Sequence, residues 1–186
     1  MAPAARQVIV LNGPVGVGKT TLGRAVAAEL GAAFIDGDDL HDPGKHWFED
    51  VLTASHALVR AGRDALERRS TLVVAKPLRA RDWRFLEGRF GALGITAHCV
   101  TLSARLDAIL DPARGRVLDA HERARAAEMI EQGYAARPFS ATIVETDRQD
   151  LIATVAHLMH VCRGLLATPP RRDLADGAAP RLHDAR

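Results

Sequence analysis

The sequence is short of the residue types that mark several classes of protein. It holds only two cysteines, Cys99 and Cys162, in apolar surroundings without the spacing of metal ligands, so we expect reduced thiols with a packing role. Lysine and arginine total 25 against 23 aspartates and glutamates, and this net charge of +2 gives no overall field that would attract nucleic acid or a membrane. The apolar run before Gly13 is too short to span a bilayer or to act as a secretory signal. We therefore expect a cytosolic protein with neither nucleic acid nor membrane as a partner.

Short apolar runs that favour β-strands recur along the chain and alternate with segments that read as helices. The predicted strands cover residues 8–11, 33–35, 72–75, 97–102 and 142–144. Strands that are apolar on both faces are covered by helices on both sides, which favours a parallel sheet with right-handed crossovers. The sequence therefore predicts an α/β protein with a five-stranded parallel sheet.

Apolar residues at helical spacing predict four main helices. They centre on residues 22–30, 48–66, 83–93 and 151–165, and Gly31 ends the first of them. A chain of 186 residues suits one compact domain, and apolar anchors stop near Leu166, so we predict a domain over residues 1–166. Residues 167–186 are mainly Pro, Arg, Ala, Asp and Gly, a composition that predicts a disordered tail.

The segment GPVGVGKT, residues 13–20, fits the phosphate-loop pattern G-x-x-x-x-G-K-[ST]. A predicted strand precedes it and a helical stripe follows it, which is the context that the motif needs to bind a nucleoside triphosphate. Backbone N–H groups can wrap the β-phosphate, Lys19 can reach the β- and γ-oxygens, and Thr20 can ligate Mg²⁺. The predicted nucleotide-binding residues are Gly13, Val15, Gly16, Val17, Gly18, Lys19, Thr20 and Thr21.

Three aspartates follow the second predicted strand in the segment FIDGDDLH. Ligands of doubly wound sheets bind beyond the carboxyl ends of the strands. Asp36, facing the phosphate loop, can hold the metal through water, whereas Asp38 can accept a hydrogen bond from a substrate hydroxyl and take its proton. Because they are two residues apart at one strand end, we expect them to share an orientation while reaching different distances from the loop. We interpret Asp39 as a cap of the following segment, and His41 is a candidate substrate contact.

The segment GPVGVGKTTLGRAVAAELGAAFIDGDDLH, residues 13–41, resembles the opening of the small P-loop metabolite kinases, particularly gluconate kinases. Shikimate kinases are similar, with an Asp-x-Asp pattern that Asp36 and Asp38 match. The resemblance extends to about residue 165. It implies a three-layer P-loop NTPase fold with a short lid, ATP and Mg²⁺ as cofactors, and metal and acceptor-hydroxyl roles for the two aspartates. It therefore supports the roles argued from their position.

The third predicted strand carries the main departure from that resemblance. It runs into KPLRARDW where shikimate kinases have a glycine triplet, and Leu78-Arg79 matches the Leu-Lys element of gluconate kinases only loosely. Lys76 either projects into the cleft, where it can pair with a substrate anion or the transferring phosphoryl group, or snorkels at the strand end. Lys76 and Arg79 are candidate substrate residues. No acidic residue ends this strand, so the carboxylate for the metal is assigned to Asp36.

Arginines are dense between the fourth predicted strand and Tyr134. A Pro-Ala-Arg-Gly-Arg loop there resembles the lid of shikimate kinases, whose arginines close over ATP and contact its phosphates. The resemblance implies a lid over about residues 111–122, with Arg114 and Arg116 as nucleotide contacts and Arg116 as the best match to a catalytic clamp. Arg123 and Arg125 lie in a helix rich in Glu and Ala, and we interpret them as its solvated face.

These features predict an ATP-dependent kinase that phosphorylates a hydroxyl of a small polar metabolite, with Lys19, Asp38 and Arg116 as catalytic residues. The alternatives are an antibiotic or nucleoside phosphotransferase, since chloramphenicol phosphotransferases have a similar opening, a regulatory P-loop NTPase, and a nucleotide-binding module without catalysis. The sequence has no Asn-Lys-x-Asp element of the kind that reads guanine. The identity of the acceptor and the choice between monomer and homodimer stay open.

Overall fold

The computed structural model of the protein describes residues 5–40 and 47–168, with side chains from residue 53 onward in the second range. His41 and residues 169–186 of the predicted tail lie outside the described residues. The strands are β1 (Gln7–Asn12), β2 (Ala33–Asp36), β3 (Thr71–Ala75), β4 (Thr96–Ser103) and β5 (Thr142–Glu145). The α-helices are α1 (Lys19–Leu30), α2 (Trp47–Leu66), α3 (Ala80–Gly91), α4 (Leu106–Leu110), α5 (Ala120–Glu131) and α6 (Leu151–Ala167), and two 3₁₀ turns are η1 (Asp38–Leu40) and η2 (Pro112–Arg114).

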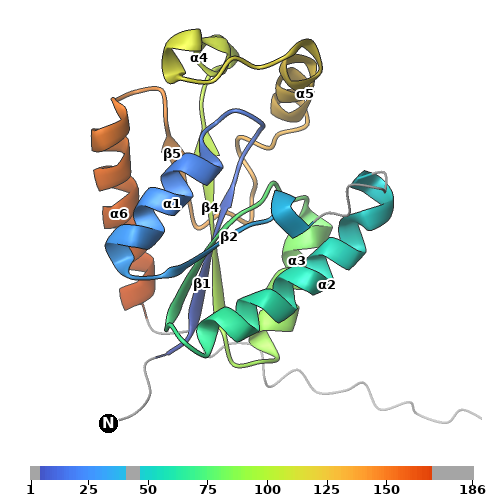
Figure 1. The fold of residues 1–186 in the computed structure, drawn as a ribbon, viewed down its shortest axis with the longest axis vertical. Helices are drawn as coiled ribbons and strands as arrows, with labels where there is room; N and C mark the ends of the chain where they lie inside the picture. Colours follow the sequence, from blue (N-terminus) through green and yellow to red (C-terminus); the bar gives the residue numbers. More distant parts are fainter. Residues whose placement is uncertain (1–4, 41–46, 169–186) are drawn as a thin grey trace, which may run out of the picture.

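The five strands form one parallel sheet in the order β2-β3-β1-β4-β5. In Figure 1, α1 and α6 lie on one side of the sheet and α2 and α3 on the other, while α4 and α5 lie beyond one end of the strands. The predicted three-layer α/β fold with a five-stranded parallel sheet is confirmed. β1 lies between β3 and β4, so the chain after β1 leaves the sheet at its centre, where such folds bind their ligands.

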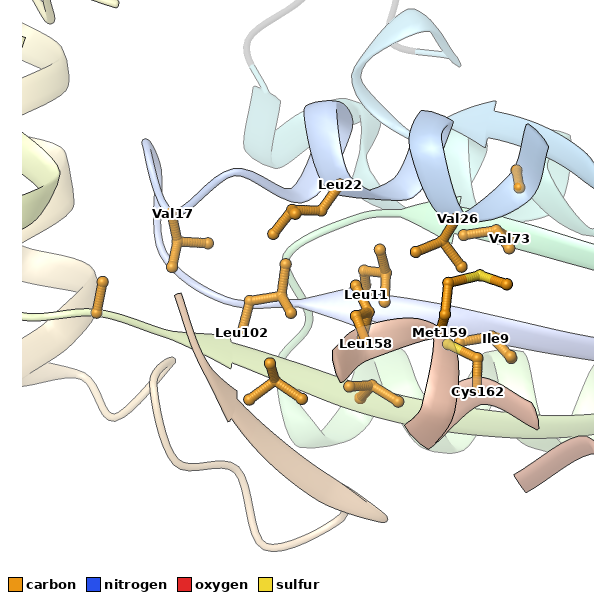
Figure 2. Close-up of a cluster of buried hydrophobic side chains, with 14 of the residues drawn as sticks. Ile9, Leu11, Val17, Leu22, Val26, Val73, Leu102, Leu158, Met159 and Cys162 are labelled. Carbon is orange, nitrogen blue, oxygen red and sulfur yellow. The ribbon is translucent and has the colours of Figure 1, made fainter. Parts of the chain in front are cut away.

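Two apolar cores sandwich the sheet, because the side chains of β1 alternate between its faces. Ile9 and Leu11 pack with α1 and α6, whereas Val8 and Val10 pack with α2 and α3. Figure 2 shows the first core, in which Leu158 and other residues of α6 approach β1. Each fully buried side chain of this size contributes roughly 1.5–3 kcal/mol by leaving water. The cores therefore hold the central strand, and the loop that follows it, in a fixed place.

Both cysteines are buried, as the sequence predicts. Burial raises the pKa of Cys99 to about 12 and that of Cys162 to about 11, so both thiols stay protonated at neutral pH. Two residues of the predicted last stripe are exposed, since 57% of Leu151 and 82% of Ile152 is open to solvent. They form the first turn of α6, which lies beyond the part that packs on the sheet. No helix among the described residues is long and apolar enough to cross a bilayer.

Candidate active site

The phosphate loop joins the end of β1 to α1. Its three glycines, Gly13, Gly16 and Gly18, have φ angles of 139°, 78° and 104°, which residues with a side chain rarely adopt. A Cβ on Gly16 would lie 2.7 Å from Cγ2 of Ile109 and 3.0 Å from Cδ1 of Leu118. Ile109 of α4 and Leu118 of the predicted lid therefore pack directly on the loop, and only glycine leaves them room.

Lys19 begins α1 and turns back over the loop that precedes it. Its ammonium donates hydrogen bonds to the carbonyl oxygens of Gly13 at 3.0 Å and Pro14 at 2.7 Å. Burial lowers the pKa of Lys19 to about 8, while the negative charges of Asp38 and Asp36 oppose this shift. The lysine is thus a cation whose charge is costly to keep, which suits a group that would pair with phosphate oxygens.

Thr20 and Asp36 form the candidate metal site. The Thr20 hydroxyl donates a hydrogen bond of 2.7 Å to a carboxylate oxygen of Asp36, the last residue of β2. Hydroxyl and carboxylate oxygens are the ligand types that Mg²⁺ prefers, and Mg²⁺ in phosphoryl-transfer enzymes is held by one or two such groups together with substrate phosphates. The pair fits that requirement. Among the described residues, no cluster of three or more His, Cys, Asp or Glu side chains could hold a metal ion.

Asp38 lines a cavity beside the phosphate loop. The sequence predicts that it extends from the strand in the same direction as Asp36, but the backbone follows a different path. The strand ends at Asp36, and Asp38 begins the turn η1. The Asp38 backbone N–H donates to Asp36 at 3.2 Å, so the chain turns instead of continuing the alternation of a strand. The predicted shared orientation assumed strand alternation from Asp36 to Asp38, and this assumption is wrong. The Asp36 side chain accepts a hydrogen bond from Thr20, whereas the exposed Asp38 lines the cavity.

Lys76 follows β3 and is only 5% exposed, and it lines the same cavity. Its backbone N–H extends the sheet by donating to Leu11 at 3.1 Å. A Cβ on Gly37 would lie 2.9 Å from both Cβ and Cγ of Lys76, so the stem of the lysine packs on the backbone between the two aspartates. Of the two alternatives for this lysine, the geometry favours projection into the cleft.

Arg79 is held at the start of α3 by two contacts. Its Nε donates to the hydroxyl of Tyr134 at 3.2 Å, and its backbone N–H donates to Asp82 at 3.1 Å. Tyr134 is 4% exposed, and its ring also contacts the guanidinium of Arg137 at 4.0 Å from the ring centroid. Arg79 therefore presents a fixed guanidinium to the cavity, and Tyr134 is a functional candidate that the sequence reasoning did not select.

The two lid arginines make different contacts. Arg114 donates to the backbone oxygen of Thr146 at 3.2 Å and to its hydroxyl at 3.1 Å, and that hydroxyl in turn donates to the Val17 carbonyl at 3.1 Å. Arg114 is thereby tied to the end of β5 and to the phosphate loop. Arg116 instead pairs with Glu122 of α5. Both arginines of the predicted lid line the cavity.

One face of α5 forms a charged wall of the cavity. The residues of α5 that line it follow helical spacing and are His121, Glu122, Arg125, Glu128 and Met129. Arg125 donates to Glu128 at 2.6 Å and is 24% exposed, so its interpretation as a solvated side chain is wrong. Arg123 does lie on the exposed face, where it donates to the backbone of Asp119. Glu122, Arg125 and Glu128 stand three residues apart in the sequence, and this spacing could have indicated that one face of the helix is charged.

The cavity has a volume of about 1070 Å³ and gathers most of the predicted site residues. Those that line it are Val15, Gly16, Gly18, Lys19, Thr20, Thr21, Asp38, Lys76, Arg79, Arg114 and Arg116. Of the remaining predicted nucleotide contacts, Gly13 bonds Lys19 through its carbonyl and Val17 is buried in the core. A phosphate-binding loop, a carboxylate and several guanidinium groups thus share one space, large enough for a nucleotide and a small second molecule.

Comparison with known proteins agrees with this geometry. Residues 9–73 match the family described as "ATPase family associated with various cellular activities (AAA)", a stretch that includes the phosphate loop. The chain is similar to the shikimate kinase of Symbiobacterium thermophilum, with 30% identity over 170 residues that cover 81% of this chain and 93% of that protein. It is also similar to a probable gluconokinase of Schizosaccharomyces pombe, at 53% identity over 36 residues, which cover 19% of each protein.

Among solved structures, a gluconokinase from Sinorhizobium meliloti has the same fold. Its TM-score is 0.62 at 20% identity, and the match covers 88% of this chain and 99% of that one. The predicted resemblance to gluconate and shikimate kinases is therefore confirmed: over most of the chain, it extends in sequence to the shikimate kinase and in fold to the gluconokinase.

Proposed function

Since the chain belongs to the shikimate kinase family of P-loop kinases, we propose that it transfers the γ-phosphate of ATP to a hydroxyl group of a small polar metabolite. The observation that carries this proposal is the convergence of Lys19, Asp38 and Arg116 on one cavity. A nucleotide-binding module without catalysis would need neither a carboxylate nor a clamp there. A cytosolic location, which would supply the ATP, is part of the proposal.

In the proposed reaction, the acceptor oxygen forms a bond to the γ-phosphorus while the bond from that phosphorus to the β,γ-bridging oxygen breaks. Asp38 takes the proton of the attacking hydroxyl, and ADP leaves with the bridging oxygen. Lys19 and Arg116 offset the negative charge that spreads over the transferring group. Bound Mg²⁺, held by Thr20 and by Asp36 through water, would neutralise phosphate charge.

Lys76 and Arg79 are proposed to orient the acceptor. Both line the cavity, and both are held by their surroundings: Lys76 by the backbone of Gly37, and Arg79 by Tyr134. Fixed cations orient a polar molecule at a smaller entropic cost than mobile ones. Gluconate and shikimate are acceptors to test first, although the chain has Lys76-Pro77-Leu78 where shikimate kinases have a glycine triplet.

A screen of sugar acids, polyols, shikimate, aromatic alcohols and nucleosides, coupled to ADP release, tests the proposal. We expect ADP release that depends on one acceptor class, and a product that carries the transferred phosphate. Asp38→Asn should lower kcat by roughly 10²–10⁴, the range for loss of a general base, with ATP affinity nearly unchanged. ATP consumption that ignores every acceptor, or full turnover by Asp38→Asn, would contradict the proposed reaction.

A further inference from the structure

Glu122 has a carboxylate whose two oxygens are used by different parts of the protein. Oε2 accepts a hydrogen bond of 3.1 Å from the backbone N–H of Asp119, and Asp119 in return accepts one of 2.8 Å from the Glu122 N–H. This reciprocal pair is a capping box, which satisfies the first N–H groups of α5. Oε1 accepts from Nη2 of Arg116. The carboxylate is therefore fixed to the helix on one side and to the arginine on the other.

Arg116 needs such an anchor because its own surroundings hold it weakly. Its side chain is 66% exposed, and it lies in the segment that follows Gly115, which has a φ of 83°. Only two residues further on, Leu118 is 4% exposed and packs on Gly16 of the phosphate loop. The backbone near Arg116 is thus anchored at the loop, while the guanidinium has many rotamers available apart from its bond to Glu122.

We infer that Glu122 is a positioning residue that holds the guanidinium of Arg116 toward the phosphate loop, so that Arg116 meets the γ-phosphate with its orientation already set. This inference rests on the proposed function, which gives Arg116 its role as a phosphate clamp. Glu122 itself does not contact phosphate in this scheme. Its whole effect on the nucleotide passes through Arg116.

Two observations indicate that Glu122 anchors Arg116 instead of competing with phosphate oxygens for its guanidinium. Glu122 bonds Nη2, and a guanidinium has five N–H donors, so most of them stay available for phosphate oxygens. Arg116 and Lys19 also line the same cavity, so the two cations face the same region beside the loop. A nearby carboxylate that belongs to the helix cap keeps these like charges close together.

A double-mutant cycle tests the inference by calorimetric titration of Mg²⁺-ATP and Mg²⁺-ADP. Glu122→Gln keeps an oxygen for the helix cap but removes the charge. We expect it to weaken ATP binding by about fivefold, the upper range for an exposed ion pair, and ADP binding by less than twofold. Arg116→Ala should weaken ATP binding more, by about tenfold or above. The double variant should match Arg116→Ala within about twofold, because Glu122 acts only through the arginine.

Asp119→Ala is the matched control, since it removes the side-chain half of the cap and leaves both the Asp119 N–H bond to Glu122 and the Arg116–Glu122 pair in place. It should lower the melting temperature while preserving the preference for ATP over ADP. Equal losses for ATP and ADP in Glu122→Gln, additive losses in the double variant, or tighter ATP binding would each overturn the positioning role. If the unaltered protein binds no ATP, the proposed function itself fails. If it binds ATP and Glu122→Gln shows no selective loss, only the positioning role fails, so the two failures are distinguishable.

Discussion

Asn12, the last residue of β1, ties together the segments that contain Leu78, Thr101 and Tyr134. It is fully buried, and its side-chain oxygen accepts from the Leu78 N–H at 2.8 Å. Its amide donates to the Thr101 hydroxyl at 2.9 Å and to the Tyr134 carbonyl at 3.3 Å. Asn12→Ala should therefore both destabilise the protein and loosen the neighbouring Arg79, whose backbone follows Leu78 directly.

The cost can be worked from these bonds. Leu78 is fully buried, so its N–H would lose its partner without gaining water, at about 1–3 kcal/mol. The Tyr134 carbonyl makes the longer bond and adds about 1 kcal/mol, whereas the Thr101 hydroxyl keeps Ser140 as a partner. We expect a loss of about 2–4 kcal/mol, which lowers the melting temperature by roughly 5–15 °C for a chain of this size.

Urea denaturation followed by circular dichroism measures this loss, and Gln7→Ala is the matched control on the same strand. The Gln7 amide donates to the Leu166 carbonyl at 2.9 Å and pairs with His98 at 3.1 Å, but it is half-buried and lies at the opposite end of β1. Its removal should cost about 1 kcal/mol and leave phosphoryl transfer unchanged. A loss below about 1 kcal/mol in Asn12→Ala, or equal effects of both variants on turnover, would refute the reasoning.

Three further predictions concern the phosphate loop. Gly16→Ala should lower the free energy of unfolding by roughly 1–3 kcal/mol, because its Cβ would overlap Ile109. Gly115 has a similar φ but open space around it, so Gly115→Ala should lower it less, and calorimetry of both variants measures the difference. The pKa of Lys19 is about 8 in the folded protein, below its ordinary 10.5, so ATP affinity should fall as pH rises through about 8; a flat titration from pH 6.5 to 9 would contradict this. Asp36→Asn should raise the Mg²⁺ concentration needed for half-maximal turnover and be partly rescued by excess metal, and a loss that no metal concentration restores would point to a structural role.

The sequence predicted those features that depend on short local patterns. The phosphate loop needs glycines at fixed positions, a strand before it and a helix after it, so eight consecutive residues with their flanks were sufficient. The central strands β1 and β3 carry apolar runs that are buried on both faces, which is typical of a parallel sheet, whereas Ile143 of the edge strand β5 is 46% exposed. The third helix ends at Gly91, however, which leaves Leu93 of its predicted stripe 37% exposed.

Contacts between distant segments were not accessible in the same way. Tyr134 gains its importance from Arg79, 55 residues away in the chain, and no local pattern marks that partnership. Glu and Ala around Arg125 are typical of an exposed helix face, and this local pattern predicts a solvated side chain. Which face of α5 lines the cavity depends on how the helix is placed relative to the phosphate loop. Leu118, just before α5, packs on Gly16 of that loop, and this contact between distant segments leaves no local pattern in the sequence.

The two halves of the cavity therefore differ in what determines them. The phosphate half is built from backbone groups and from Lys19 and Thr20, within one continuous segment. The proposed acceptor half takes Lys76 from the end of β3 and Arg79 from the start of α3, and Arg125 of α5 lines the same cavity; these elements meet only in the folded protein. Donor chemistry can then stay the same while three separate segments alter the shape and charge of the acceptor wall. Under the proposed function, we expect those three side chains and their partners to select the acceptor, since the phosphate loop would serve any of the candidate acceptors equally well.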